Sequence, residues 1–120
     1  HYLHRRQRQM CIRDSVNLSA RVGSITDNRL GGWISYRSSK AALNQIIKTS
    51  SIEINRRNKN AICVGLHPGT VKTKFTEKFQ NTTKTISPKE SVEMMMKVVE
   101  NLSVDDNGYC FAYDGKAIPA

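Results

Sequence analysis

The chain has 120 residues, and its 19 lysines and arginines outnumber 10 acidic residues to give a formal net charge of +9. That length fits one small domain, and 38% hydrophobic with 24% charged residues is ordinary for a folded protein, which excludes a wholly disordered chain. No apolar run approaches the roughly 20 residues of a membrane span, and no apolar signal stretch opens the sequence. Three scattered cysteines exclude a disulfide framework or a zinc cluster, so we expect a cytoplasmic protein that holds no metal and contacts no membrane.

The first fifteen residues, HYLHRRQRQMCIRDS, have no hydrophobic period, and taken literally they form a basic arm suited to nucleic acid. The run from Arg5 to Asp14 resembles one reading frame of a transposase-type sequencing adapter. We therefore interpret residues 1–15 as translated adapter and residues 16–120 as native sequence. The four arginines and one aspartate of the segment contribute +3 of the net charge, and without them we expect no nucleic-acid partner.

The sequence after residue 15 alternates between strand and helix patterns. Residues 16–19 are typical of the end of a buried strand, and residues 20–35 contain the Gly, Asp and Asn of a long loop. The continuously apolar residues 61–66 predict a strand that is buried on both faces. Between them, helical spacing without Pro or Gly predicts a helix over about 35–57, carried by Leu43, Ile46, Ile47, Ser50 and Ile54.

The rest of the chain adds one helix and one strand. Residues 70–86 are rich in Lys and Thr and read as an excursion, and Ser87-Pro88-Lys89-Glu90 has the cap, the proline and the acidic residue of a helix start. Residues 109–113 predict the last strand. Two strand–helix–strand units in series predict an α/β fold with a parallel sheet and right-handed crossovers. The apolar stripe of the second helix, whose three consecutive methionines we expect in the core, comprises Val92, Met95, Met96, Val99 and Leu102.

Tyr36 and Lys40, at the start of the long helix, are the residues that suggest chemistry. A spacing of four residues puts both side chains on one helical face, one turn apart. A lone tyrosine has a pKa of about 10 and is a poor proton shuttle at neutral pH, but an ammonium group within about 4–6 Å favours the phenolate and lowers that pKa. The pair therefore predicts a general acid/base.

Three segments, in order, resemble the short-chain dehydrogenase/reductase family. The segment YRSSKAALN, Tyr36 to Asn44, is similar to the family's Tyr-x-x-x-Lys segment, and LHPGTVKT, residues 66–73, is similar to its Pro-Gly motif with a downstream threonine. Residues 17–33 look like the strand and loop before the catalytic tyrosine. The resemblance covers about residues 16–120 and is closest to the branch that contains C-factor and small carbonyl reductases. It implies the C-terminal half of a Rossmann-type doubly wound parallel sheet, with three strands and two helices.

The resemblance implies an NAD(P)-dependent oxidoreductase that transfers a hydride between nicotinamide and a small carbonyl or alcohol substrate. Tyr36 would exchange the hydroxyl proton, and Lys40 would bind the nicotinamide ribose and hold Tyr36 toward phenolate. Pro68 and Gly69 would bring backbone close to the nicotinamide, and Thr73 would contact its carboxamide. The cofactor, NADP or NAD, would supply the redox chemistry, whereas the protein supplies placement and proton transfer.

The family's carbonyl-polarising serine has two candidates here. The position that aligns best holds Ala20, because the usual Ser-Ser pair reads Ser19-Ala20. Ser24 lies twelve residues before Tyr36, near the family's common spacing, so we favour Ser24 and keep Ser19 as the alternative. If neither hydroxyl reaches the carbonyl, oxyanion stabilisation falls to Tyr36 alone, at a cost of about ten- to a thousandfold in rate.

The seven glycines form no Gly-rich dinucleotide loop, which in this family belongs to the first strand–helix turn. We therefore expect a C-terminal piece of a longer protein that does not turn over substrate by itself. The outer face of the long helix is mixed, with Gln45, Lys48 and Glu53, and we expect a homodimer there. The alternative function is a family member that signals or interacts without turnover, which Ala20 in the serine position favours.

Overall fold

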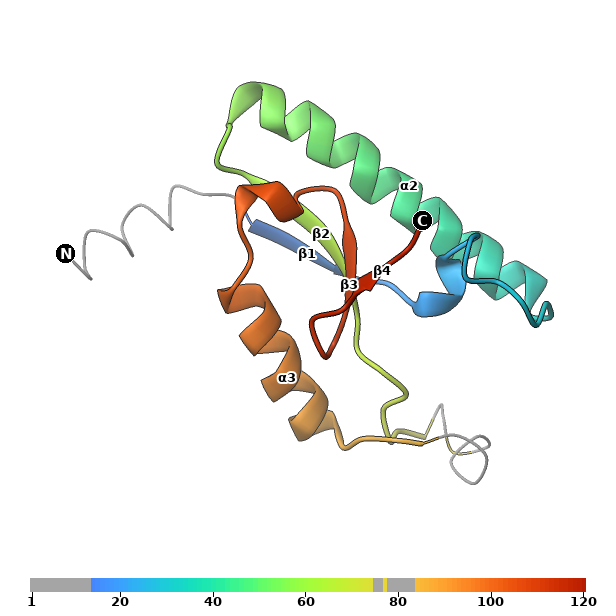
Figure 1. Ribbon diagram of the computed structural model, residues 1–120. Helices are drawn as coiled ribbons and strands as arrows, with labels where there is room; N and C mark the ends of the chain where they lie inside the picture. Colours follow the sequence, from blue (N-terminus) through green and yellow to red (C-terminus); the bar gives the residue numbers. More distant parts are fainter. Residues whose placement is uncertain (1–13, 75–76, 78–83) are drawn as a thin grey trace.

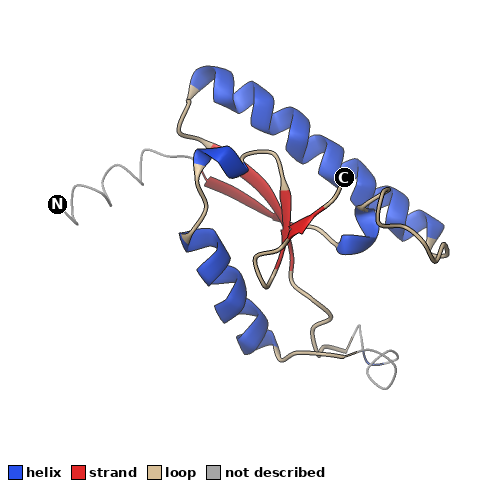
Figure 2. Ribbon diagram, viewed as in Figure 1, coloured by secondary structure: helices blue, strands red, loops and turns tan. Residues whose placement is uncertain are grey.

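The computed structural model describes residues 14–74, 77 and 84–120 (Figures 1 and 2). Residues 1–13, which make up most of the segment interpreted as adapter, lie outside the described residues. The last two residues of that segment, Asp14 and Ser15, are the first two residues of the first strand. The adapter interpretation stays a prediction. In chain order the elements are β1 (Asp14–Leu18), the 3-10 helix η1 (Arg21–Gly23), α2 (Ile34–Arg57), β2 (Ile62–His67), α3 (Pro88–Glu100), the 3-10 helix η3 (Val104–Asp106), β3 (Cys110–Ala112) and β4 (Ala117–Ile118).

The four strands form one sheet in the order β1-β2-β3-β4. β1 pairs with β2 and β2 pairs with β3 in parallel, so Leu66 of β2 lies between Leu18 and Phe111. The predicted parallel α/β sheet is confirmed. β4 was not predicted, because a strand of two residues is too short to show an alternating pattern. It returns antiparallel to β3 after a turn in which the Ala112 N–H donates to the Lys116 carbonyl at 2.8 Å.

Two helices cover the sheet from opposite sides, α2 on one face and α3 on the other (Figure 1). β2 lies between them, and residues 61–66 are buried, as their continuous apolar run predicts. Because β1, β2 and β3 follow one another across the sheet while their connecting helices lie on opposite faces, the two crossovers have opposite hands. The expectation of two right-handed crossovers is therefore wrong for one of them, since α3 lies on the face opposite α2.

β1 is an edge strand with largely exposed side chains, which corrects the prediction of a buried strand. Val16 is 37% exposed and Leu18 is 59% exposed. The strand lies at the end of the sheet order, so only β2 pairs with it in the described part of the chain. α2 packs over β2 rather than over β1, and this leaves the apolar side chains of β1 accessible.

The second helix, α3, begins as predicted. The Glu90 N–H donates to Ser87 Oγ at 3.1 Å, and Pro88 is the first helical residue. The bond to Ser87 pairs one of the N–H groups that a helix start leaves unpaired, and Pro88 has no N–H to leave unpaired. In the parts of the chain that are described, neither α2 nor α3 is long and apolar enough to cross a membrane.

The face that α3 buries differs from the predicted stripe. Val92 and Met96 are 53% and 51% exposed, so two members of the stripe, one of them a methionine expected in the core, lie outside it. Ser91 is buried instead, at 1% exposure. Its hydroxyl donates to the Pro68 carbonyl at 2.6 Å, so a hydrogen bond rather than hydrophobicity fixes this face of the helix.

Candidate active site

Tyr36 and Lys40 lie one turn apart at the start of α2, with their side chains together. Lys40 Nζ is 5.7 Å from the centroid of the Tyr36 ring. Helical spacing places them on the same face as Ile47 and Ser51, which are 1% and 2% exposed and mark the buried side of the helix. Tyr36 itself is 41% exposed, because it lies about three helical turns before Ile47, the first buried residue of that face. The phenol is therefore accessible while its helix is anchored.

The hydroxyl of Ser19 is bound to α2. Ser19 Oγ donates to Asn44 Oδ1 at 2.5 Å, and the Cys110 thiol donates to the same oxygen at 3.4 Å. Burial raises the pKa of the Cys110 thiol, which keeps the proton that this bond needs. Asn44 follows Lys40 by one helical turn, so one side-chain oxygen joins the ends of two strands to the helix that carries Tyr36.

The hydroxyl of Ser24 is also engaged within the chain. Ser24 Oγ donates to the Ala120 carbonyl at 3.2 Å and accepts from the Asp27 N–H at 3.1 Å, and the residue is 1% exposed. It lines a pocket with Ser38 and Ala41, which lie on a different flank of α2 from Tyr36. The choice between Ser24 and Ser19 stays a prediction.

Gly23 fixes η1 against α2 beside the tyrosine–lysine pair. A Cβ at this position would lie 2.8 Å from the Lys40 carbonyl carbon and 2.9 Å from the Asn44 amide nitrogen. Any side chain here would therefore push the helix away at Lys40. The sequence indicates this glycine only as a loop residue, and its role as a packing contact is visible only in three dimensions.

The Pro68-Gly69 turn follows β2 and is held from two sides. Ser91 of α3 donates to the Pro68 carbonyl at 2.6 Å. Gly69 has a φ of +83°, and a Cβ there would lie 2.9 Å from the Tyr113 ring, so both the backbone and the packing require glycine. Thr73, which lies three residues after Thr70, is exposed.

His67 ends β2 at the same edge of the sheet. Its Nδ1 is buried and has no hydrogen-bond partner among the described residues. Burial lowers the pKa of the imidazole, the positive charge of Arg21 lowers it further, and Asp114 acts in the opposite direction. Arg37, the neighbour of Tyr36, lines the same pocket as His67, so the Tyr36 and Pro68 segments meet at the carboxyl ends of β1 and β2.

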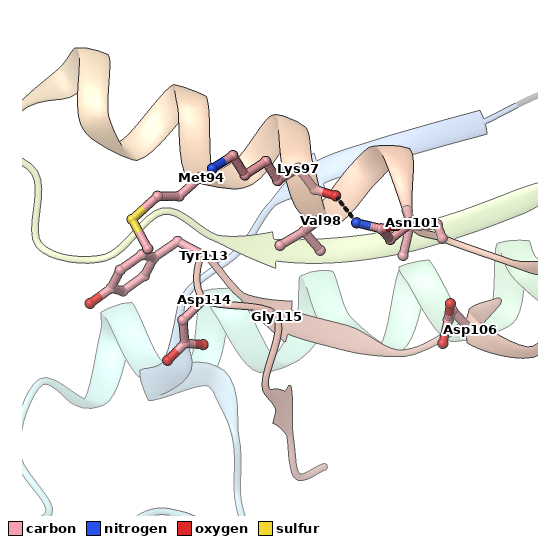
Figure 3. A pocket seen from close by; sticks show the side chains of 9 residues that line it. Met94, Lys97, Val98, Asn101, Asp106, Tyr113, Asp114 and Gly115 are labelled. Carbon is pink, nitrogen blue, oxygen red and sulfur yellow. Dashed lines mark hydrogen bonds between the residues drawn. The ribbon is translucent and has the colours of Figure 1, made fainter.

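A separate pocket of about 330 Å³ lies between α3 and the β3–β4 turn (Figure 3). It shares no residue with the predicted site, and its Asn101 side chain is already used, donating to the Lys97 carbonyl at 2.8 Å. Within the described ranges, no three His, Cys, Asp or Glu side chains gather as they would around a metal ion. We therefore place the candidate active site at the carboxyl edge of β1 and β2.

Two curated proteins resemble the chain over most of its length. An uncharacterized oxidoreductase of Schizosaccharomyces pombe is 37% identical over 89% of this chain and 47% of that protein. The C-signal protein of Myxococcus xanthus is 33% identical over 93% of this chain and 64% of that protein. No family profile matches the sequence.

Three solved structures share the fold. The carbonyl reductase Sniffer of Drosophila melanogaster gives a TM-score of 0.78 at 32% identity, over 89% of this chain and 41% of that one. An NADPH-bound carbonyl reductase from chicken fatty liver gives 0.75 at 36% identity, over 89% of this chain and 42% of that one. A short-chain dehydrogenase/reductase of Burkholderia multivorans with bound NADP gives 0.69 at 27% identity, over 89% and 44%. These comparisons bear out the resemblance to the short-chain dehydrogenase/reductase family.

The chain spans less than half the length of its first curated relative and of these solved structures. Its sheet and two helices correspond to part of a Rossmann-type α/β fold, as the resemblance implied. All of the site residues taken from the sequence motifs lie in described segments of the chain.

Two residues that position the site were missed by sequence reasoning. Asn44 stands four residues after Lys40, and that spacing could have indicated a polar residue on a neighbouring part of the same helix surface. Ser91 gave no such signal, because a serine in the first turn of a helix is ordinary. Its partner, the Pro68 carbonyl, lies 23 residues away in sequence.

Proposed function

We propose that this chain is the C-terminal half of an NAD(P)-dependent oxidoreductase that interconverts a carbonyl and an alcohol. The observation that carries the proposal is the pair of Tyr36 and Lys40, whose side chains come within 5.7 Å of each other (Nζ to ring centroid) on the exposed start of α2. Two of the similar structures hold NADPH or NADP, and one of these is a carbonyl reductase. They support the same cofactor and substrate class for the whole protein.

The roles of the two side chains follow from their chemistry. In reduction, the Tyr36 hydroxyl gives its proton to the carbonyl oxygen, and in oxidation the phenolate takes the proton of the alcohol. Lys40 carries its positive charge one helical turn from the phenol, and we propose that its ammonium donates to the ribose hydroxyls. The nicotinamide, when bound, supplies or accepts the hydride.

The described residues fit the nicotinamide end of such a cofactor. Gly69 packs on Tyr113, and Ser91 holds the carbonyl of Pro68, so the turn has a fixed backbone beside which we propose that the nicotinamide ring lies. Thr73 is exposed, and we propose that it contacts the carboxamide. Since no glycine-rich phosphate loop occurs in the sequence, we propose that the remainder of the domain supplies it and that the chain alone does not turn over substrate.

Tyr36→Phe tests the proton transfer in the protein that carries the complete family domain. We expect kcat for NADPH-dependent carbonyl reduction to fall by about 100-fold or more, because the phenyl ring has no proton to give. The Kd for NADPH, measured by cofactor fluorescence, should change little. Tyr109→Phe, which alters another partly exposed tyrosine outside the site, is the matched control. Full reductase activity in Tyr36→Phe would overturn the assignment.

The same assay tests the serines. If the Ser24 hydroxyl leaves the Ala120 carbonyl to serve the substrate, Ser24→Ala should lower kcat by about ten- to a thousandfold, and Ser19→Ala should not. The reverse result would assign Ser19. Unchanged kcat in both variants would leave Tyr36 as the sole donor to the carbonyl oxygen.

Three observations favour a second function, signalling or interaction without turnover. Ala20 occupies the aligned serine position, Ser19 and Ser24 both donate hydrogen bonds within the chain, and one relative is a C-signal protein. Calorimetric titration with NADPH and NADH separates the two functions. A folded protein that binds neither nucleotide would favour signalling over catalysis.

We further propose that the protein is cytoplasmic and forms a homodimer through the outer face of α2. Gln45, Lys48 and Glu53 are exposed on that helix. Sedimentation equilibrium at micromolar concentration tests the dimer, and a single monomeric mass at every concentration would contradict it.

A further inference from the structure

A pocket of about 510 Å³ opens at the carboxyl ends of β1 and β2. Its volume lies within the range of about 300–1,000 Å³ typical of small-molecule sites. The walls come from η1, from the loop before α2, from the first turn of α2 and from the end of β2. The lining residues are Arg21, Val22, Asp27, Arg29, Leu30, Arg37, His67 and Thr70.

The charged groups of this pocket are mostly positive. Three arginines face one carboxylate, that of Asp27, which lies 3.6 Å from an Arg21 guanidinium nitrogen. Arg37 donates to the carbonyls of Gly31 and Gly32 at 3.1 and 2.9 Å, and these neutral groups orient its guanidinium without cancelling its charge. In residues 14–74, 77 and 84–120, no carboxylate pairs with Arg29 or Arg37. The lining therefore carries a net charge of +2.

His67 adds a neutral donor or acceptor to the same wall. Its Nδ1 is buried and unpartnered within the described residues, and a buried polar nitrogen without a partner is costly. Burial and the nearby Arg21 both keep the imidazole in its neutral form. A ligand oxygen at this wall would accept from the guanidinium groups, whereas the buried Nδ1 of His67 meets a ligand only if the side chain turns.

We propose that this pocket binds the carboxylate or phosphate of an anionic carbonyl substrate. Guanidinium groups bind both oxyanions with short, charge-assisted and often bidentate hydrogen bonds. Arg37 directly follows Tyr36 on α2, so the pocket opens on the flank of the helix next to the one that carries the phenol, and a substrate anchored here would have to extend around the helix to reach it. The inference rests on the proposed oxidoreductase function and adds the substrate class to it.

The test compares two carbonyl compounds that differ in one charge, 4-formylbenzoate and its methyl ester, in the complete protein with saturating NADPH. We expect the KM for the carboxylate to be about tenfold lower than for the ester, equivalent to about 1.4 kcal/mol. Arg29→Gln should reduce that ratio to about threefold or less, because it removes an exposed charge without a structural partner. Equal KM values for the two compounds in the unaltered protein would overturn the proposal.

Arg56→Gln is the matched control, since it removes the same charge at the other end of α2. Its KM ratio should equal that of the unaltered protein, and a similar fall in both variants would show a general charge effect and refute the pocket. The Kd values for NADPH and NADH distinguish the second source of an oxyanion. If Arg29→Gln weakens NADPH binding alone and leaves the KM ratio intact, the pocket holds a cofactor phosphate and the substrate assignment is wrong.

A binding measurement separates this proposal from the proposed function. Calorimetric titration with 4-methylbenzoate and with 4-methylbenzamide needs no reduction, so it applies even if neither aldehyde is turned over. We expect the carboxylate to bind about tenfold more tightly, with the difference shrinking in Arg29→Gln and as salt is raised from 50 to 500 mM. Equal affinity for acid and amide would overturn the pocket assignment whatever the activity.

Discussion

At the scale of single residues, Asn44 is the side chain on which two buried hydrogen bonds converge, from Ser19 and from Cys110. Asn44→Ala removes the acceptor and leaves the Ser19 hydroxyl, 6% exposed, without a partner. We expect the free energy of unfolding to fall by about 1–3 kcal/mol, measured by urea denaturation.

The neighbouring Gln45→Ala provides the comparison for Asn44→Ala. The Gln45 amide is exposed, and its bond to Thr49 is long, at 3.4 Å. We expect its loss to change the free energy of unfolding by less than about 0.5 kcal/mol. Equal losses in the two variants would show that the bonds to Asn44 contribute nothing net to stability.

The imidazole of His67 makes stability depend on pH. Its pKa is lowered in the folded chain, first by burial and then by Arg21, so the unfolded chain binds a proton more readily. The free energy of unfolding is therefore highest above the ordinary histidine pKa of about 6.5 and falls as pH drops below it, toward the lower folded value. Urea midpoints between about pH 5 and 7.5 measure this slope.

His67→Gln removes the titrating group and should flatten that part of the stability profile. The glutamine side chain keeps a polar end at the pocket wall, so the protein need not lose its fold. A slope that persists unchanged in His67→Gln would assign the pH dependence to other groups.

At the scale of elements, the contact between η1 and α2 depends on the absence of a side chain at Gly23. Gly23→Ala would place a methyl group 2.8 Å from the Lys40 carbonyl carbon, and rigid backbone cannot move aside cheaply. We expect overpacking to lower the free energy of unfolding by about 1–3 kcal/mol. Because the helix shifts at Lys40, kcat of the complete protein should fall as well.

Gly31→Ala is the comparison that separates crowding from backbone conformation. Gly31 has a φ of +69° with open space around it, so alanine there is strained but meets no neighbour. We expect a loss of about 1 kcal/mol and no change in kcat. A larger stability loss in Gly31→Ala than in Gly23→Ala would contradict the packing argument.

At the scale of the whole molecule, the sequence was informative where a pattern repeats over many residues. The spacing in residues 35–57 predicted α2, because the helix is long and contains no Pro or Gly, and the apolar run 61–66 predicted β2, because those residues are all buried. The exposure of β1, the hand of one crossover and the short β4 could not be read, since each depends on which segments lie side by side. Local patterns contain no such information.

The candidate site likewise contains some residues that the sequence could pair and others that only the fold brings together. Tyr36 and Lys40 could be paired from their spacing, because one helix fixes their geometry. The bonds of Ser19 to Asn44 and of Ser24 to Ala120 join positions 25 and 96 residues apart, so no linear spacing predicts them. The basic pocket likewise gathers arginines from three segments around one histidine, and only the fold brings them together.

The carbonyl of Ala120 accepts two hydrogen bonds from the loop after β1, from the Thr26 N–H at 2.8 Å and from Ser24 Oγ at 3.2 Å. A loop that rests on residue 120 cannot settle until that residue has left the ribosome. Contacts between residues so far apart in sequence also form late in folding, because the entropy lost in closing the long loop between them must be overcome before the contacts stabilise the fold. The wall of the candidate site beside Ser24 is thus completed only after residue 120 has been synthesised, and a protein cut after Ile118 would make that wall without its support.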